Sequence, residues 1–475
     1  MSFVSPGFLV FLPAVLALYR LTPWQKRWMV LLPSSYFFYA CHSPWLLSLI
    51  FLTTLVSYGS ALRIERAETR KQKRRAVVLD AVVCLGILFI FKYLDFALGG
   101  VFSLLRLFGV ESGFTGFHLL LPMGISLYVF QTMSYTFDVY RGTIRAERHL
   151  GYYALFVSFF PQLVAGPIER PGDLLPQLKA PNPLEQEDIA QGVRFLVRGY
   201  GKKVLISDFL APFVDTAYGD AASAGGAAMV LATVLFALQI YCDFSGYSDI
   251  AVGCARLMGI RLTENFRQPY AAGSIRDFWR RWHISLTRWF TDYLYIPLGG
   301  SRRGLFRQCL NILVVFLVSG LWHGANLTFV VWGGLHGVFL TAETLLLGKQ
   351  QLKSPLGRGL HRAVTLVLVC FAWVFFRASD LSQAVSILQS IFTDFRLSDA
   401  LTGLGMGRVE LILACLLVFL LPLLERLPAL SVRENQLRGR YALPLLYFLL
   451  IAAIAICRCL VLTEHGATAF IYFQF

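Results

Sequence analysis

The sequence has few charged residues and no long polar interval. Only 15% of its 475 residues are Asp, Glu, Lys or Arg, whereas 56% are hydrophobic, and the mean hydropathy is +0.61. This composition lies well outside the range of soluble globular proteins. The longest polar interval, residues 166–191, is rich in proline and predicts only a loop or short surface helices. A soluble domain is therefore excluded, and we expect an integral membrane protein.

Two other features are missing: paired cysteines and a signal-peptide pattern. The opening MSFVSPGFLVFLPAVLALY lacks the basic start of a cleaved signal peptide, so we expect its apolar segment to remain as a helix. None of the nine cysteines stands in a CxxC pair, which predicts free buried thiols without disulfides, and no metal site. The cysteines in apolar segments include Cys84, Cys242, Cys254, Cys370 and Cys415.

Many apolar stretches are long enough to suggest membrane spans, because a spanning helix needs about 20 mainly apolar residues. By this rule we expect an all-α polytopic protein with roughly ten to twelve passes, some of them short or broken. The candidate segments are 8–20, 28–40, 44–62, 76–97, 118–138, 151–166, 190–215, 227–256, 309–346 (more than one pass), 361–376, 408–424 and 441–462.

The net charge of +15 comes from basic residues that lie beside apolar segments. In this position basic residues orient helices and meet anionic lipid headgroups, and no aromatic-basic module points to nucleic acid. Arg20, Lys26 and Arg27 follow the first segment, and seven Lys or Arg residues lie within 63–75, after the third. Positive loops face the cytoplasm, so both loops predict an extracytoplasmic N-terminus.

The uncharged run from Gln308 to Ala342 contains two histidines. A single helix of this length would extend about 52 Å, more than the hydrocarbon core of about 30 Å. We expect a break within 319–326, where Asn326 can cap a new helix, and a first piece of about 14 residues that is too short to cross alone. His323 would then lie at a break within the membrane, beside a cavity.

Each histidine has a structural and a functional interpretation. A histidine can pack in a helix bundle with one hydrogen bond, but polar residues inside membranes are costly and often mark function. His323 favours the functional interpretation. His336 lies in GGLHG, whose small residues suit close helix packing, and it favours the structural one.

Residues 274–300 predict an amphipathic helix that starts with a capping-box-like pair, Ser274 and Asp277, and ends near Pro297. At the 3.6-residue period, Arg276, Arg280 and His283 would share one face. The helix could lie in the headgroup layer, or its arginines could form a rim that draws an anionic substrate towards His283.

Two carboxylates lie in the apolar stretch YCDFSGYSDIAVG. Asp243 and Asp249 are surrounded by hydroxyl groups that would reduce the cost of burying them. We expect them to hold the bundle together, pairing with arginines of the 274–288 helix. The alternative is an orienting role in catalysis.

Together these motifs strongly resemble the membrane-bound O-acyltransferase (MBOAT) family, and in particular its alginate O-acetyltransferase branch. The resemblance rests on several long stretches in the same order and runs from about residue 1 to residue 400, with the family motifs mainly in 121–400. It implies a single domain over 1–475, in which 401–475 form C-terminal helices. The matching stretches are LPMGISLYVFQTMSYTFDVYRG, SFFPQLVAGPIERP, YCDFSGYSDIAVG, NFRQPYAAGSIRDFWRRWHISLTRWFTDYLYIPLGGSR, GLWHGANLTFVVWGGLHG and WVFFRASDL.

The resemblance implies a ring of helices, some broken or interfacial, around a central tunnel. It makes His323 of the WHG motif catalytic and His283 of the RWH motif a second essential or supporting residue. A neutral imidazole can take the proton of an acceptor hydroxyl, which suits His323 as general base. Asn326, the backbone at Gly324 or a protonated His283 could stabilise the oxyanion.

The expected supporting or substrate-binding residues are Asn326, Arg276, Arg280, Trp322, Asp243 and His336. No GxSxG motif supports a Ser-His-Asp triad on this chain.

The resemblance also implies a cytoplasmic acetyl donor, acetyl-CoA, with no bound cofactor. Its implied partners are extracytoplasmic SGNH-type acetyltransferase proteins, membrane lipid and a polysaccharide acceptor such as alginate or cellulose, in the bacterial inner membrane. Two other functions fit many passes and buried carboxylates: a transporter or flippase for a lipid-linked sugar, and a non-catalytic scaffold of a polysaccharide export complex.

Overall fold

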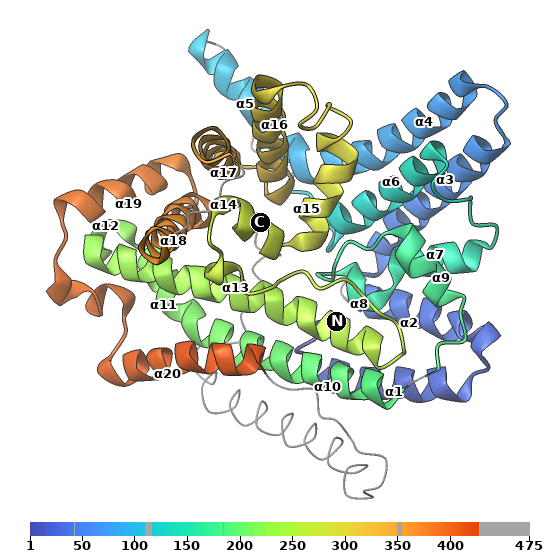
Figure 1. The fold of residues 1–475 in the computed structure, drawn as a ribbon, viewed down its shortest axis with the longest axis horizontal. Helices are drawn as coiled ribbons and strands as arrows, with labels where there is room; N and C mark the ends of the chain where they lie inside the picture. Colours follow the sequence, from blue (N-terminus) through green and yellow to red (C-terminus); the bar gives the residue numbers. More distant parts are fainter. Residues whose placement is uncertain (42, 110–115, 184, 349–353, 427–475) are drawn as a thin grey trace, which may run out of the picture. The chain divides into compact units, whose positions relative to one another are not determined.

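The computed structural model describes residues 1–41, 43–109, 116–183, 185–348 and 354–426 (Figure 1). Helices and their connecting loops make up this part of the chain, and it contains no strand. The prediction of an all-α protein is confirmed. The predicted segment 441–462, and the C-terminal helices expected beyond residue 426, lie outside the described residues.

The contacts within the chain separate two compact units. One contains residues 1–192 and 251–263, and the other contains 193–250 and the chain from 264 onwards. Two helices, α10 (Gln186–Tyr200) and α13 (Gly226–Arg256), contribute residues to both units. The three histidines of interest all belong to the second unit.

In the first unit, three helices lie side by side: α3 (Leu47–Arg66), α4 (Arg70–Leu88) and α6 (Ile125–Arg141) (Figure 1). A capping box fixes the start of α4, because the Thr69 hydroxyl accepts from the Gln72 N–H at 3.2 Å while the Gln72 amide accepts from the Thr69 N–H at 3.1 Å. The unit also contains α1 (Pro6–Leu21), α2 (Trp28–Ala40), α5 (Leu94–Leu107), α7 (Leu150–Ser158), α8 (Phe160–Leu163) and α9 (Pro171–Leu178).

Polar contacts hold the polar interval 166–191 of this unit in place. Its predicted short surface helix is present as α9, and the interval ends in the first turns of α10. The buried Glu169 carboxylate accepts from the Thr263 N–H at 2.6 Å, and Arg256 pairs with Asp188 at 2.9 Å. The interval is therefore packed against residues 251–263 of the same unit.

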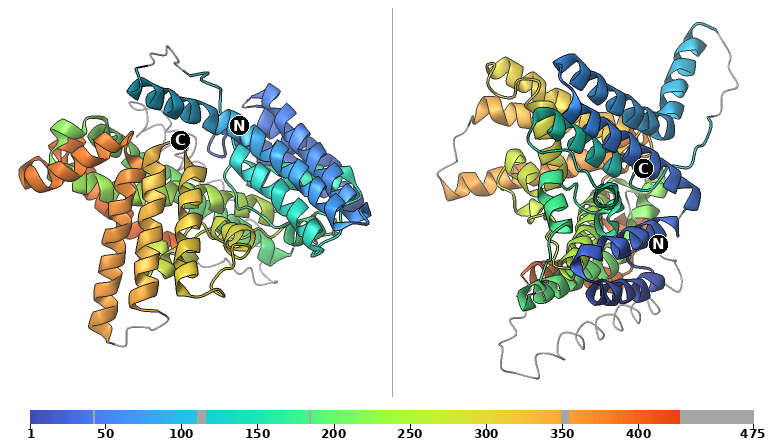
Figure 2. Two further views of the ribbon diagram at one scale, coloured as in Figure 1. Left: turned by 90° about the horizontal axis from the view of Figure 1, so that it is seen from above. Right: turned by 90° about the vertical axis from the view of Figure 1, so that its right-hand side faces the viewer.

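The second unit contains three helices that lie side by side in the left view of Figure 2: α16 (Leu305–His323), α17 (Leu327–Leu346) and α18 (Pro355–Arg377). Its other α-helices are α11 (Asp208–Gly219), α12 (Ala221–Ala224), α14 (Ile275–Arg281), α15 (Ile284–Phe290), α19 (Leu381–Thr393) and α20 (Arg408–Glu425). Residues 201–207 continue α10 as a π-helical turn.

Six described helices are long and apolar enough to cross a membrane, and a seventh span is possible if the bent pair Leu397–Leu404 and Arg408–Glu425 counts as one. The protein is therefore a multi-pass membrane protein, but the described residues contain fewer full-length spans than the ten to twelve predicted. Several predicted segments form short helices, such as the 13 residues of α2 and the 9 residues of α7. Apolar sequence alone does not distinguish a short helix packed within the protein from a helix that crosses lipid.

Candidate active site

The predicted break lies between α16 and α17. Helix α16 ends at His323, and α17 begins at Leu327 with Asn326 as its N-cap. The Asn326 side chain accepts from the Thr328 N–H at 3.1 Å and donates to the Ser379 carbonyl at 2.7 Å. The predicted cap is confirmed. Because these backbone groups already engage its amide, Asn326 is better suited to hold the turn than to stabilise an oxyanion.

The predicted length of the first helical piece is wrong. Helix α16 starts at Leu305 and contains 19 residues, so it is long enough to cross a membrane. The helix was expected to start after Arg307 because this residue is charged. A basic residue is, however, tolerated near the end of a membrane span. His323 therefore lies at the end of a full-length helix.

Glycines allow α16 and α17 to pack closely. A methyl group on Gly320 would lie 2.2 Å from the Phe329 carbonyl oxygen, and one on Gly333 would lie 2.2 Å from the Phe316 carbonyl oxygen. Neither site can hold a side chain unless the helices move apart. The predicted packing role of the small residues near His336 is confirmed.

His283 lies in a sharp turn and not inside a helix. Helix α14 ends at Arg281, α15 begins at Ile284, and His283 adopts the left-handed conformation with φ +43° and ψ +56°. Asn265 fixes the turn, because its carbonyl oxygen accepts from the Ile284 N–H at 3.0 Å and its side chain accepts from the Ser285 N–H at 3.2 Å.

The prediction of one continuous amphipathic helix over 274–300 is therefore wrong, and the arginines do not share a helical face with His283. Only the start of the predicted helix is confirmed: the Ser274 hydroxyl accepts from the Asp277 N–H at 3.1 Å. The apolar period runs through the break because both short helices bury their tryptophans, Trp279 in α14 and Trp289 in α15.

The break brings His283 and His323 together. Their ring centroids are 6.5 Å apart, and the two residues are 1% and 4% exposed. The Trp322 ring lies 6.0 Å from His283 and 5.0 Å from His323, centroid to centroid. Phe244 also packs against His283, with ring centroids 4.7 Å apart. Two imidazoles thus meet in an aromatic environment that excludes most water.

Burial lowers the pKa of His283 to about 3, because the charged imidazolium loses its hydration there. His283 is therefore neutral at physiological pH, which corrects the expectation that a protonated His283 is available. Within the described part of the chain, neither of its ring nitrogens has a hydrogen-bond partner. A neutral imidazole still carries one N–H that can act as a donor.

His336 has a different environment. It is fully buried, and its Nδ1 accepts a hydrogen bond from the Trp279 indole N–H at 3.3 Å. Its ring stacks on Phe278 with an interplanar angle of 5° and lies 5.1 Å from the Trp332 ring, centroid to centroid. This arrangement favours the structural interpretation of His336.

The two predicted arginines have different surroundings. Arg276 donates to the Gly348 carbonyl and the Thr344 hydroxyl, both at 3.0 Å, so it is tied to the end of α17. Arg280 is exposed. Sequence reasoning missed Glu343, whose carboxylate accepts from the Ile275 N–H at 2.7 Å and so caps α14. The sequence feature that could have identified Glu343 is that it is a lone acidic residue in an apolar helix.

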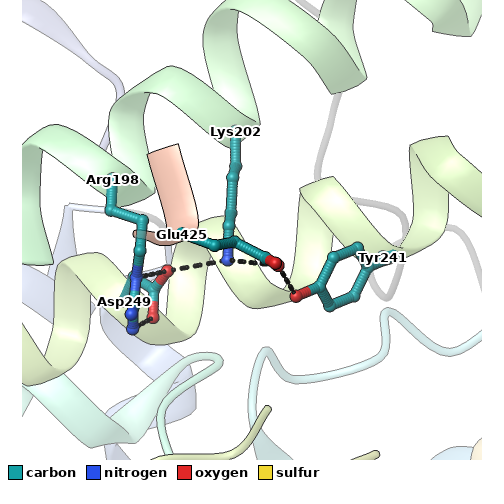
Figure 3. A network of polar contacts seen from close by, with 5 residues as sticks. All are labelled: Arg198, Lys202, Tyr241, Asp249 and Glu425. Atoms are coloured by element: carbon teal, nitrogen blue, oxygen red, sulfur yellow. Dashed lines mark hydrogen bonds and ion pairs between the residues drawn. The ribbon is translucent and has the colours of Figure 1, made fainter. Parts of the chain in front are cut away.

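Buried lysines and an arginine pair with the two aspartates. Lys203 contacts Asp243 at 2.5 Å and Asp208 at 2.8 Å, and these side chains are 1% exposed. Arg198 binds both oxygens of Asp249, at 2.5 and 2.7 Å (Figure 3).

The predicted pairing of Asp243 and Asp249 with arginines of 274–288 is therefore wrong. The missed signal was the basic group RGYGKK, residues 198–203, inside a segment predicted to be apolar. Within the described residues, no group of three or more His, Cys, Asp or Glu side chains could hold a metal ion.

Comparison with known proteins identifies the family of this chain. Residues 31–379, which include all three histidines, match the membrane-bound O-acyltransferase family. The chain is 42% identical to the "Probable alginate O-acetylase AlgI" of Azotobacter vinelandii over 84% of this chain and 80% of that protein.

Two further relatives carry other names. The "Peptidoglycan O-acetyltransferase" of Helicobacter pylori is 35% identical over 82% of this chain and 78% of its own. The "Teichoic acid D-alanyltransferase" of Bacillus subtilis is 26% identical over 54% of this chain and 68% of its own. The chain belongs to the membrane-bound O-acyltransferase family and is an O-acyltransferase.

Proposed function

We propose that this O-acyltransferase moves acetyl groups from a cytoplasmic donor, acetyl-CoA, to a hydroxyl group on the extracytoplasmic side. The acceptor is an extracytoplasmic partner protein of the SGNH type, or directly a cell-surface polysaccharide such as alginate or cellulose. The observation that carries the proposal is the buried pair of His283 and His323. The names of the relatives that act on alginate and peptidoglycan support acetyl as the transferred group.

His323 is the general base in this proposal. A hydroxyl group is a poor nucleophile until its proton is withdrawn, and a neutral imidazole can accept that proton at physiological pH. As the hydroxyl oxygen bonds to the acyl carbon, the carbonyl electrons move onto its oxygen and His323 becomes protonated. The oxyanion electrons then re-form the carbonyl, the carbon–sulfur bond of the acetyl-CoA thioester breaks, and the leaving thiolate takes the proton from His323, which is neutral again.

His283 stabilises the oxyanion in the same proposal. The carbonyl oxygen gains negative charge during the attack, and a fixed donor in a dry site stabilises that charge more than water would. The neutral His283 carries one N–H, and its ring is near enough to His323 for both to reach one small acyl group. Trp322 packs against both imidazoles and limits their movement.

The access route follows from the family resemblance. We propose that donor and acceptor reach the histidines from opposite faces of the bacterial inner membrane through a tunnel in a ring of helices. The exposed Arg280 is the residue that we assign to attracting the anionic donor. The two alternatives, a transporter and a scaffold, gain no support from Asp243 and Asp249, because Lys203, Arg198 and Lys202 already pair with them.

Inverted membrane vesicles with acetyl-labelled acetyl-CoA outside test the proposal. We expect label to appear on the acceptor with the wild-type chain and not with His323→Ala at an equal protein level. Transfer by His323→Ala at the wild-type rate would contradict the assigned base. An absence of transfer with the wild type, in the presence of its partner proteins, would favour the transporter or the scaffold.

A further inference from the structure

A buried polar network connects three helical segments of the second unit. It joins Arg198 and Lys202, from α10 and the π-helical turn after it, to Tyr241 and Asp249 of α13 and to Glu425 of α20 (Figure 3). The charged side chains are between 3% and 11% exposed. Within the described residues, no hydrogen bond or ring contact joins this network directly to His283 or His323, so the proposed acyl transfer gives the network no role.

The network converges on the Tyr241 hydroxyl. Lys202 bridges two carboxylates, with its ammonium 3.2 Å from Asp249 and 3.7 Å from Glu425. Glu425 in turn accepts a hydrogen bond from the Tyr241 hydroxyl. The Lys202 ammonium also lies 5.1 Å from the centre of the Tyr241 ring, within the range of a cation–π contact. The hydroxyl end of Tyr241 is therefore fixed.

The ring of Tyr241 supports the turn that holds His283. Its centroid lies 5.9 Å from that of Phe266 and 6.2 Å from that of Trp282. Trp282 directly precedes His283, and Phe266 packs 5.1 Å from Trp282 and 6.5 Å from His283. One tyrosine thus joins the charged network to the aromatic side chains around His283.

The position of His283 requires such support. Its backbone is in the left-handed conformation, which is unfavourable for a residue with a side chain and persists only where the surroundings hold it. Buried charges cost free energy to desolvate, and apolar residues of similar size often give equal stability. Such groups can instead specify one arrangement of their neighbours.

We infer that Tyr241, anchored by Glu425 and Lys202, is a positioning residue that holds Trp282 and His283 in the geometry needed for acyl transfer. The inference rests on the proposed function for its catalytic consequence, but its structural part can be tested without any transfer. Loss of the Tyr241 hydroxyl keeps the aromatic packing and the Lys202 contact with the ring and removes only the hydrogen bond to Glu425, so the His283 turn should loosen without general unfolding.

Labelling of histidines by diethyl pyrocarbonate tests the structural part on the full-length protein in detergent. Trypsin cleaves after Arg281 and Arg288, so His283 lies in the short peptide WHISLTR and its labelling is measured by mass spectrometry. The exposed His149 serves as the reference, and the buried His336 reports general unfolding. We expect Tyr241→Phe to raise the labelling rate of His283 about fivefold, through local opening, with His336 unchanged.

Tyr218→Phe is the matched control. The hydroxyl of Tyr218, a residue of α11, forms one buried hydrogen bond with Thr233 of α13, at 3.0 Å. Within the described residues, its ring packs against Phe236 and makes no ring contact with residues 265–284. This variant should leave the labelling of His283 at the wild-type rate. Unchanged labelling of His283 in Tyr241→Phe, or an equal rise at His336, would overturn the inference.

Kinetics of acetyl transfer test the catalytic consequence. Tyr241→Phe should lower kcat about tenfold, as misplaced catalytic groups do, with an unchanged KM for the donor. Glu425→Gln, which keeps a hydrogen-bond acceptor for Tyr241 but loses the ion pair with Lys202, should give a smaller loss. A kcat for Tyr241→Phe equal to that of Tyr218→Phe would overturn the inference. If the wild type transfers no acetyl, the proposed function fails, while the labelling result for the anchored turn still stands.

Discussion

At the scale of single residues, the surroundings of each histidine decide its role. His283 and His323 lie next to each other among aromatic rings, whereas His336 accepts a hydrogen bond from Trp279 and stacks on Phe278. The sequence alone favoured a functional role for His323 and a packing role for His336, but it did not show which side chains surround each imidazole.

Burial of neutral His283 gives the stability of the protein a pH dependence. Its folded pKa of about 3 lies below the unfolded value of 6.5, so the unfolded state binds a proton first as the pH falls. The stabilisation is complete above pH 6.5 and decreases below it, by about 1 kcal/mol at pH 5.5. Melting temperatures at pH 7.5 and 5.5 should therefore differ less for His283→Gln than for the wild type. His149→Gln, at an exposed position, should keep the wild-type difference; the same difference in all three proteins would contradict the assigned burial.

The two arginines should respond differently to replacement by alanine. Arg276 donates two hydrogen bonds to the end of α17, so Arg276→Ala should lower the free energy of unfolding by about 1–2 kcal/mol. The exposed Arg280 makes no such hydrogen bond within the described residues. Arg280→Ala should raise the KM for the anionic donor and leave the melting temperature unchanged. An unchanged KM for the donor would contradict the proposed role of Arg280 in donor binding.

At the scale of helices, close backbone contact holds the α16–α17 hairpin together, and glycine makes that contact possible. Gly333 and Gly334 are neighbours on α17 and provide a matched pair. A methyl group at Gly333 would lie 2.2 Å from a carbonyl oxygen, whereas one at Gly334 would lie 3.6 Å from the nearest atom, in Leu317.

Gly333→Ala should therefore separate the helices and lower the free energy of unfolding by about 1–3 kcal/mol. Gly334→Ala should be neutral or stabilising, because alanine favours a helix by about 1 kcal/mol over glycine. Thermal unfolding in detergent measures both effects. Equal melting temperatures for the two variants would contradict the close packing seen in the hairpin.

The ion pairs of α13 make a second prediction at this scale. Asp243→Asn leaves Lys203 with one carboxylate partner, Asp208. It should lower the free energy of unfolding by about 3–5 kcal/mol, as loss of one partner of a buried ion pair does. The turnover of the protein that remains folded should change little. The control Asp215→Asn breaks an exposed ion pair with Arg377 and should lower the free energy of unfolding by less than about 1 kcal/mol. A large loss of turnover at normal stability would instead make Asp243 part of catalysis.

Sequence patterns predicted some elements well because their signals are local. Asn326 as a helix cap and the glycines near His336 depend on neighbouring residues, so both were predicted correctly. The partners of Asp243 and Asp249 lie about 40 to 50 positions earlier in the chain, and no local pattern specifies them. The turn at His283 was missed because its hydrophobic period continues through the break.

At the scale of the whole molecule, composition and long motifs were sufficient to predict a multi-pass membrane O-acyltransferase. The described residues contain fewer full-length spans than predicted, because several of their apolar helices are too short to cross a bilayer. The two histidines of the proposed site are 40 residues apart in the sequence, and the turn after α14 and the end of α16 bring them together.

The role of His323 as general base is best tested in cells that carry His323→Ala or His336→Ala. The measurement is the acetyl ester content of the cell-surface polysaccharide, together with the membrane level of each protein. We expect esters to disappear with His323→Ala at a normal protein level. With His336→Ala, any loss of esters should follow loss of the protein itself, because His336 packs the helices. Normal acetylation in cells that contain His323→Ala at the wild-type level would show that His323 is not the base.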